Sequence, residues 1–304
     1  MIFDDIRCFP DRMGYQEALS GVRELCVEHL GEHLGGQLAA LARPAFDLKP
    51  ADESSAAAGL CRWGGPALLE PGTPWPMYAG VPLSLYAVLD VGALSPWLGD
   101  QIPPTGSALL NFFFLDPETG STEVPKEASG FSYDDPQVCR VVPADPQRAI
   151  EIAAPDPAPR FDRIPLVATP VVTLPSASSY DCDPVLNSLD FGNEFEETSL
   201  YRVNPGWLVV DKFGEDAWPR YCVSEQGIEW GGMSNQAFGW PPIRSYGVDL
   251  LEELSPDEPY VHLLTLGSTD LWEWGDGGIV RFVAPAKALW EGDLSQVRAN
   301  PDDW

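Results

Sequence analysis

Two histidines four residues apart form a familiar catalytic pattern. His29-Leu30-Gly31-Glu32-His33 has the H-x-x-E-H spacing of the inverted zinc proteases, in which histidines at i and i+4 of a helix bind Zn²⁺ and the glutamate acts as general base. Such a site also needs a third protein ligand and a cleft, and a five-residue match with a glycine inside it arises easily by chance. We therefore interpret both histidines as the edge of a core-facing helix, and we predict no metal site and no cofactor.

Other residues that could carry catalysis are few. The third histidine, His262, lies in the apolar run from Tyr260 to Leu266, where a hydrogen-bonded histidine inside a sheet is more common than a catalytic base. Asp181 and Asp183 lack the acid spacing and the fixed glycine of a calcium loop. The sequence contains no G-x-S-x-G nucleophile elbow, no G-x-x-x-x-G-K phosphate loop and no G-x-G-x-x-G dinucleotide turn. We predict no catalytic residues, which favours a protein that is not an enzyme.

The charge of the chain excludes one class of partner and suggests another. With 46 acidic and 18 basic residues, the formal net charge is −28. Direct nucleic-acid binding depends on basic residues that neutralise phosphates, so we do not expect it. The same field attracts a basic protein and speeds its association. The alternative, that the acidity only maintains solubility, remains open.

The cysteines and the N-terminus indicate a reducing compartment. The six cysteines are widely spaced and form no C-x-x-C motif, so we expect free thiols in a cytoplasmic protein. Acids occupy the segment from Met1 to Arg7, where a signal peptide needs basic residues. No run approaches the roughly 18 apolar residues that span a bilayer, so we expect no membrane association.

Several periodic stretches supply the elements that would position these residues. From Gly14 to Ala42 apolar residues recur at steps of three and four, which predicts an N-terminal helix, and Gly31, Gly35 and Gly36 weaken its middle. The segment from Phe46 to Ala58 is predicted to be a loop. The run from Pro165 to Leu174 contains Pro170 and is predicted to be an edge strand.

A turn followed by two strands occurs twice along the chain. Trp63-Gly64-Gly65-Pro66 is a tight turn, because glycine tolerates positive φ and proline fixes its own φ, and apolar runs at 81–91 and 107–115 follow it. The second occurrence is Phe238-Gly239-Trp240-Pro241-Pro242, followed by apolar runs at 260–266 and 279–283. We interpret the chain as two related halves. The proline-rich segment at 143–159 is the predicted junction between them.

These motifs resemble those of the YwqG family of bacterial proteins of unknown function. The shared motifs, in chain order, are Arg43-Pro44-Ala45, Cys61-Arg62-Trp63-Gly64-Gly65-Pro66, Pro74-Trp75-Pro76, Ile102-Pro103-Pro104-Thr105-Gly106, Thr173-Leu174-Pro175-Ser176, Phe238-Gly239-Trp240-Pro241 and Trp274-Gly275-Asp276-Gly277-Gly278. The resemblance implies an α+β fold with an internally duplicated sheet and brings no established activity. Where the family pattern has polar residues, often glutamine, this chain has Val88, Thr265 and Arg244, which weakens any shared polar pocket.

Taken together, the sequence predicts an α+β fold whose mainly antiparallel sheet has two pseudo-repeated halves. A helical segment at 1–43 precedes a first sheet half at 44–150 and a second at 160–304, and the halves pack as one globular domain. The expected function is that of an acidic cytoplasmic interaction protein that neutralises a basic partner such as a toxin domain. The alternative is a small-molecule-binding protein or hydrolase that uses a groove between the halves, because domain junctions are common ligand sites.

The predicted binding and turn residues follow from the same motifs. Aromatic and charged side chains near the turns would line the groove, and they are Arg62, Trp75, Asp90, Arg244, Trp274 and Asp276. The structural turn residues are Gly64, Gly65, Pro66, Gly275 and Gly277. The oligomeric state is left open.

Overall fold

The computed structural model describes residues 12–52, 55–99, 109–115, 135–175, 183–192, 235–241, 260–274 and 278–302. The helices are α1 (Arg12–Ala40), α2 (Val91–Leu98), α3 (Asp183–Leu186) and α7 (Ala286–Trp290), with a 3₁₀ turn η3 (Leu294–Gln296). The strands are β1 (Arg43–Pro50), β2 (Arg62–Trp63), β3 (Ala67–Leu69), β4 (Met77–Tyr78), β5 (Val81–Pro82), β6 (Ser84–Asp90), β7 (Leu109–Phe114), β8 (Cys139–Ala144), β9 (Ile150–Ile152), β10 (Ile164–Thr173), β11 (Asn235–Ala237), β12 (Tyr260–Gly267), β13 (Ile279–Pro285) and β14 (Arg298–Asp302).

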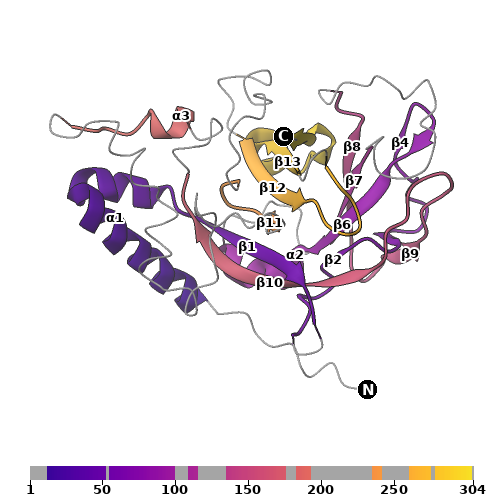
Figure 1. Ribbon diagram of the computed structural model, residues 1–304, viewed down its shortest axis with the longest axis horizontal. Coiled ribbons are helices and arrows are strands. Elements are labelled where there is room, and N and C mark those ends of the chain that lie inside the picture. The colour runs from indigo at the N-terminus through magenta and orange to yellow at the C-terminus, as the bar shows by residue number, and fades with distance from the viewer. Residues whose placement is uncertain are drawn as a thin grey trace.

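One antiparallel sheet of ten strands forms the body of the molecule, so the predicted α+β fold is confirmed. Its strand order is β14-β13-β12-β11-β1-β10-β2-β6-β7-β8. Thus β1 and β10 form the centre, with four strands on either side (Figure 1). The sheet curves so strongly that its two edge strands approach each other. The contact that shows this is a hydrogen bond of 3.3 Å from the Cys139 thiol of β8 to the carbonyl of Val297, next to β14. Two small sheets, β3 with β9 and β4 with β5, complete the strands.

The two four-stranded groups share a turn of unusual backbone geometry. Gly64 and Gly65, after β2, have φ values of 52° and 74°. Phe238 and Gly239, after β11, have φ values of 60° and 71°. The amide of Gly64 donates to the carbonyl of Tyr86 at 2.9 Å, just as the amide of Phe238 donates to that of Leu263 at 3.1 Å. Positive φ is uncommon outside glycine, so Phe238 is held there by its surroundings.

The two groups also share an irregularity in their next strands. Pairing between β6 and β7 shifts register between Leu85 and Ala87, and pairing between β12 and β13 shifts register between His262 and Leu264. Such bulges bend a strand and increase its twist. Each group therefore curves at the corresponding place in its sheet.

The central strands correct two predictions. The predicted loop from Phe46 to Ala58 is wrong for its first residues, since β1 extends to Pro50 and pairs with both β10 and β11. The predicted edge strand around Pro170 is wrong as well, because β10 lies between β1 and β2. Its proline is tolerated because β2 pairs with β10 only through Ile164 and Pro165, so Pro170 faces β1 alone.

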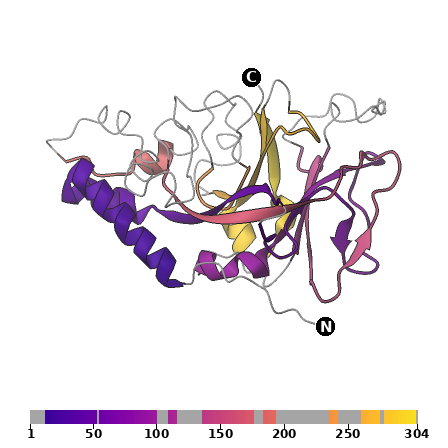
Figure 2. The same cartoon turned by 60° about the horizontal axis from the view of Figure 1, so that its bottom comes forward.

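Helix α1 confirms the predicted N-terminal helix and breaks within the predicted glycine cluster. Gly31 is non-helical, with φ 77° and ψ 165°, and separates a first arm, residues 12–30, from a second arm, residues 32–40. The arms meet at Gly35, where a Cβ would lie 2.3 Å from the carbonyl oxygen of Cys26. Only glycine allows this backbone-to-backbone approach. Both α1 and α2 contact the central strands, on the same side of β1 and β10 (Figure 2).

Aromatic side chains join the two groups inside the curved sheet. Phe112 of β7 and Phe282 of β13 pack edge to face, with ring centroids 5.2 Å apart. Trp272 and Trp274, which follow β12, pack on Tyr86 of β6 at 5.2 and 4.8 Å. Large aromatic rings bury extensive apolar area, so this cluster links the two sides of the sheet into one core. In the described part of the chain, no helix has the length and apolar character to cross a bilayer.

Candidate functional site

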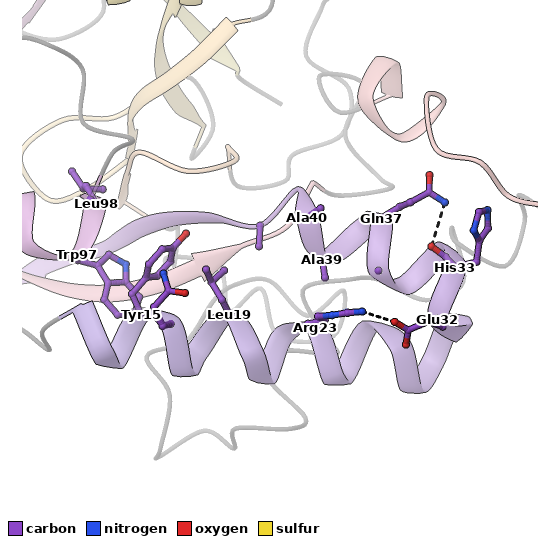
Figure 3. A pocket seen from close by; sticks show the side chains of 14 residues that line it. Tyr15, Leu19, Arg23, Glu32, His33, Gln37, Ala39, Ala40, Trp97 and Leu98 are labelled. Carbon is purple, nitrogen blue, oxygen red and sulfur yellow. Dashed lines mark hydrogen bonds and ion pairs between the residues drawn. The ribbon is translucent and has the colours of Figure 1, made fainter.

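A large groove opens between the two arms of α1 and the end of α2. Its volume is about 1400 Å³. Its lining residues are Tyr15, Gln16, Leu19, Arg23, Glu32, His33, Gly36, Gln37, Ala39, Ala40, Ala42, Trp97, Leu98 and Gly99. Figure 3 shows an aromatic end at Tyr15 and Trp97 and a charged end at Arg23 and Glu32. The groove is thus amphipathic along its length.

The aromatic end is fixed by packing and by one hydrogen bond. The rings of Tyr15 and Trp97 meet edge to face with centroids 5.0 Å apart. The Trp97 indole donates to the carbonyl of Val171 in β10 at 3.0 Å, which anchors α2 to the central strands. Burial raises the pKa of Tyr15 to about 12, so its hydroxyl is neutral at physiological pH and can donate as well as accept hydrogen bonds.

Ion pairs and amide contacts define the charged end. Arg23 of the first arm pairs with Glu32 of the second, across the bend at Gly31. His33 lies 3.0 Å from the carboxylate of Asp190. Gln37 donates to the carbonyl of Asp190 and accepts from its amide, both at 3.0 Å. These contacts tie the second arm to a segment more than 150 residues away in sequence.

The bend at Gly31 also separates the two histidines of the zinc-protease motif. Because Gly31 leaves the helical conformation, His29 and His33 do not share a face of one continuous helix. Glu32 pairs with Arg23 and His33 with Asp190, while the His29 side chain is exposed. Among the described residues, no cluster of three or more His, Cys, Asp or Glu side chains could hold a metal ion. The continuous helix that the motif requires is therefore interrupted between His29 and His33.

His262 is a buried, hydrogen-bonded sheet histidine, as predicted. Its Nδ1 lies 3.0 Å from the carbonyl of Phe238 and its Nε2 lies 2.7 Å from the hydroxyl of Thr265. Burial, together with a smaller contribution from the nearby charge of Arg281, lowers the pKa of His262 to about 3, so the ring is neutral at physiological pH. Both nitrogens are engaged, which favours a structural role for His262 in holding the turn at Phe238.

Two buried side-chain amides and one arginine hold strand β3 and the turns that follow β2 and β11. Asn111 of β7 donates to the carbonyl of Leu68 at 2.8 Å and accepts from its amide at 2.9 Å, which fixes β3 against β7. Arg62 donates to the carbonyl of Pro66 at 2.5 Å, and Gln236 donates to the corresponding carbonyl of Trp240 at 2.6 Å. Burial lowers the pKa of Arg62 to about 10, and the neighbouring Arg163 adds to the shift. The contacts of these polar groups are therefore with the fold itself.

A comparison with protein families matches most of this architecture. The model of the family described as Domain of unknown function (DUF1963) matches residues 61–302. The chain belongs to the DUF1963 family. No curated protein matches it. The match begins after β1, so both arms of α1 and one of the two central strands of this DUF1963 protein lie before the matched region.

The structure of this DUF1963 protein separates two of the predicted binding residues, Trp75 and Trp274. Trp75 packs on Phe113 at 5.1 Å, whereas Trp274 packs on the next residue of β7, Phe114, at 5.7 Å. Successive residues of a strand point to opposite faces, so the two tryptophans lie on opposite sides of the sheet. Trp274 is only 1% exposed.

The remaining predicted residues have local roles or lie elsewhere. Asp90 accepts from the amides of Ala93 at the start of α2 and of Leu60. Gly64 and Gly65 occupy the left-handed turn for which they were predicted, and Pro66 supplies the carbonyl that Arg62 binds. Arg244, Gly275, Asp276 and Gly277 lie outside the described residues.

The described cysteines are free thiols, as expected. Cys26, Cys61 and Cys139 are buried and form no disulfide. Burial raises the pKa of each to about 12, so they are protonated and poor nucleophiles. They behave as small hydrophobic residues of the core.

No single stretch of the sequence predicts the groove. Its aromatic residues, Tyr15 and Trp97, are separated by 82 positions (97 − 15) and come from elements that only the fold brings together. The available signal was the glycine cluster, since a break at Gly31 with close packing at Gly35 folds α1 back on itself.

Proposed function

We propose that this DUF1963 protein is an acidic, cytoplasmic interaction protein that binds and neutralises a basic protein partner, such as a toxin domain. One observation carries the proposal, which is the net charge of −28 on 304 residues. A field of this size attracts cationic proteins and repels nucleic acids and anionic surfaces. Electrostatic attraction of this kind gives fast association and selects partners by sign of charge.

The hydrogen bonding and protonation of the candidate catalytic groups support an interaction role. His262 is neutral with both ring nitrogens hydrogen bonded, and the described thiols are buried and protonated. In contrast, the acidic side chains of Glu17 and Glu28 in the first arm of α1 are exposed. Exposed acids on a rigid helix are available to Lys and Arg side chains of a partner.

Affinity capture tests this proposal. The tagged protein is incubated with an extract of cells that naturally express it, at about 50 mM and at about 500 mM salt, where the Debye length shrinks from over 10 Å to about 4 Å. We expect a basic protein to be retained at low salt and lost at high salt. Capture of neutral or acidic proteins only, or of none at low salt, would refute the proposal.

A second candidate function is the binding of a small molecule, or its hydrolysis. One observation favours it, since the groove combines the aromatic pair of Tyr15 and Trp97 with the polar groups of Gln16 and Gln37. A thermal-shift screen against metabolites and metal ions separates the two candidates. A ligand at 100 times its Kd stabilises the fold by about 2.7 kcal/mol.

We also propose that the sheet arose by internal duplication, as the resemblance to the YwqG family implies. The matching turns at Gly64 and Phe238 and the matching bulges at Leu85 and His262 support it. In this scheme β1 and β10 are corresponding first strands, and each pairs with the other half, β1 with β11 and β10 with β2. Buried free thiols support the cytoplasmic location.

A further inference from the structure

We propose that the groove between the arms of α1 and the end of α2 is the docking site, and that it takes an amphipathic, basic α-helix of the partner. This inference rests on the proposed function and names the surface that performs it. Helix-in-groove recognition places the apolar face of a helix in a hydrophobic groove and leaves its polar face outside. Four features of the groove favour this occupant.

The first feature is size. The groove encloses about 1400 Å³, which exceeds the roughly 300–1,000 Å³ of clefts for small molecules. From Tyr15 to Arg23 the first arm extends about 12 Å at the helical rise of about 1.5 Å per residue. A peptide helix about 10–12 Å wide and two turns long has matching dimensions.

The second feature is the shape of the wall formed by the second arm. Gly36, Ala39 and Ala40 line it, and none has a side chain larger than a methyl group (Figure 3). The distance between packed helices depends on the side chains at their contact, so a wall of small residues lets another helix approach closely. A wall of this kind suits a helix better than it suits an extended strand with unpaired backbone groups.

The third feature is the apolar surface opposite this wall. Tyr15 and Leu19 of the first arm are half-buried and retain surface for contact, and Trp97 beneath them is almost fully buried. The indole bond to Val171 makes this surface rigid before binding. A leucine or aromatic side chain from the partner would pack here at low entropic cost.

The fourth feature is the distribution of charge. Arg23 is already paired with Glu32, and His33 lies 3.0 Å from Asp190, so the charge of Arg23 is matched by a local acid. The first arm also exposes Glu17 and Glu28 along its outer side. Glu17 and Glu28 do not line the groove, so the preference for lysine and arginine on the polar face of the bound helix comes from the net charge of −28 of the whole chain.

The test uses a fluorescent peptide of about 14 residues, two turns of anchoring helix with flanks, built only from leucine and lysine at helical spacing. Fluorescence anisotropy measures its Kd with the full-length protein. Ala40→Trp fills the groove from an exposed position, so we expect at least about tenfold weaker binding, or 1.4 kcal/mol. Ala153→Trp is the matched control, since Ala153 is exposed and follows β9, at the far end of the molecule from α1 (Figure 1). We expect it to bind like the wild type.

A second peptide and a second variant complete the design. A peptide of the same composition with leucine at every second position, which suits a strand, should bind at least about tenfold more weakly. Leu19→Gln should weaken binding without filling the groove, and thermal melts confirm that each variant is folded. Failure of the helical peptide to bind, or equal binding by wild type and Ala40→Trp, would overturn the proposed docking site.

The outcomes separate this inference from the proposed function. If the cell extract yields a basic partner that Ala40→Trp captures as well as the wild type, the function stands and the groove is not its site. If no basic partner is retained but the peptide binds in the groove, the groove is a peptide site and the charge-based function falls.

Discussion

The side chain of His262 should make the free energy of unfolding depend on pH. Its pKa is lowered to about 3 by burial, while the unfolded chain has the usual histidine value near 6.5. Between these values the unfolded state binds the extra proton, so this residue makes stability fall as the pH falls from about 6.5 towards about 3. The change is on the order of 1.4 kcal/mol per pH unit for one group.

We therefore predict that His262→Gln is less stable than the wild type at pH 7 and that the difference shrinks as the pH is lowered through this window. Urea titrations at several pH values measure the free energy of unfolding of both proteins. The exposed His29→Gln is the control and should parallel the wild type. A difference that stays constant with pH would show that His262 has the same pKa in the folded and unfolded chains.

Two adjacent glycines in the second arm of α1 should respond in opposite ways to the same change. At Gly35 a Cβ would lie 2.3 Å from the Cys26 carbonyl oxygen, whereas at Gly36 nothing lies within 4 Å. We predict that Gly35→Ala costs about 1–3 kcal/mol, as overpacking does, and that Gly36→Ala gains about 0.5–1 kcal/mol from helix propensity. Thermal or urea unfolding measures both. Equal effects would mean that the arms do not touch at Gly35.

At the scale of elements, Asn111 holds a short strand that covers the sheet. Its side chain makes three hydrogen bonds, two with Leu68 of β3 and one with the carbonyl of Val142. We predict that Asn111→Ala costs on the order of 3 kcal/mol, because buried backbone groups lose their partners. Hydrogen exchange should show the Leu68 amide losing protection while the Thr265 amide in the other group keeps it. Uniform loss across both groups would contradict a local role.

The sequence predicted the elements that have strong local signals. The kinked helix followed from its apolar period and its glycines, and β6, β7, β12 and β13 followed from long apolar runs. It failed for β1, whose Lys49-Pro50 end is typical of a loop and whose strand character comes from pairing with β10 and β11. It also missed α2, which begins directly after β6 with Asp90 as its cap. Tertiary partners, absent from any local window, decided these elements.

The candidate site was harder to predict for the same reason. The turns at Gly64 and Gly65 were found, since positive φ is a property of single residues. Trp75 and Trp274 were predicted to line one groove, which requires both to cover the same face of β7. Trp75 packs on Phe113 and Trp274 on Phe114, and these two phenylalanines point to opposite faces. A one-residue difference in register thus separates two side chains that motif order placed together.

At the scale of the whole molecule, the central strands link the N-terminal and C-terminal parts of the chain in one sheet. The N-terminal β1 pairs with β10 and β11, and β10 also pairs with β2. We predict that fragments 1–158 and 159–304, cut in the segment between β9 and β10, do not fold separately but form a one-to-one complex when expressed together. Size-exclusion chromatography and circular dichroism measure this. A cooperative thermal transition in either fragment alone would contradict it.

The position of β1 at the centre of the sheet has a consequence for biosynthesis. Arg43 and its partner Thr173 are 130 residues apart, so β1 leaves the ribosome well before the strand that it must pair with. At roughly 5–20 residues per second the delay is on the order of ten seconds. During that time the backbone groups of β1 lack the partners that they have in the finished sheet. The nascent chain therefore completes its central sheet only after β10 has been synthesised.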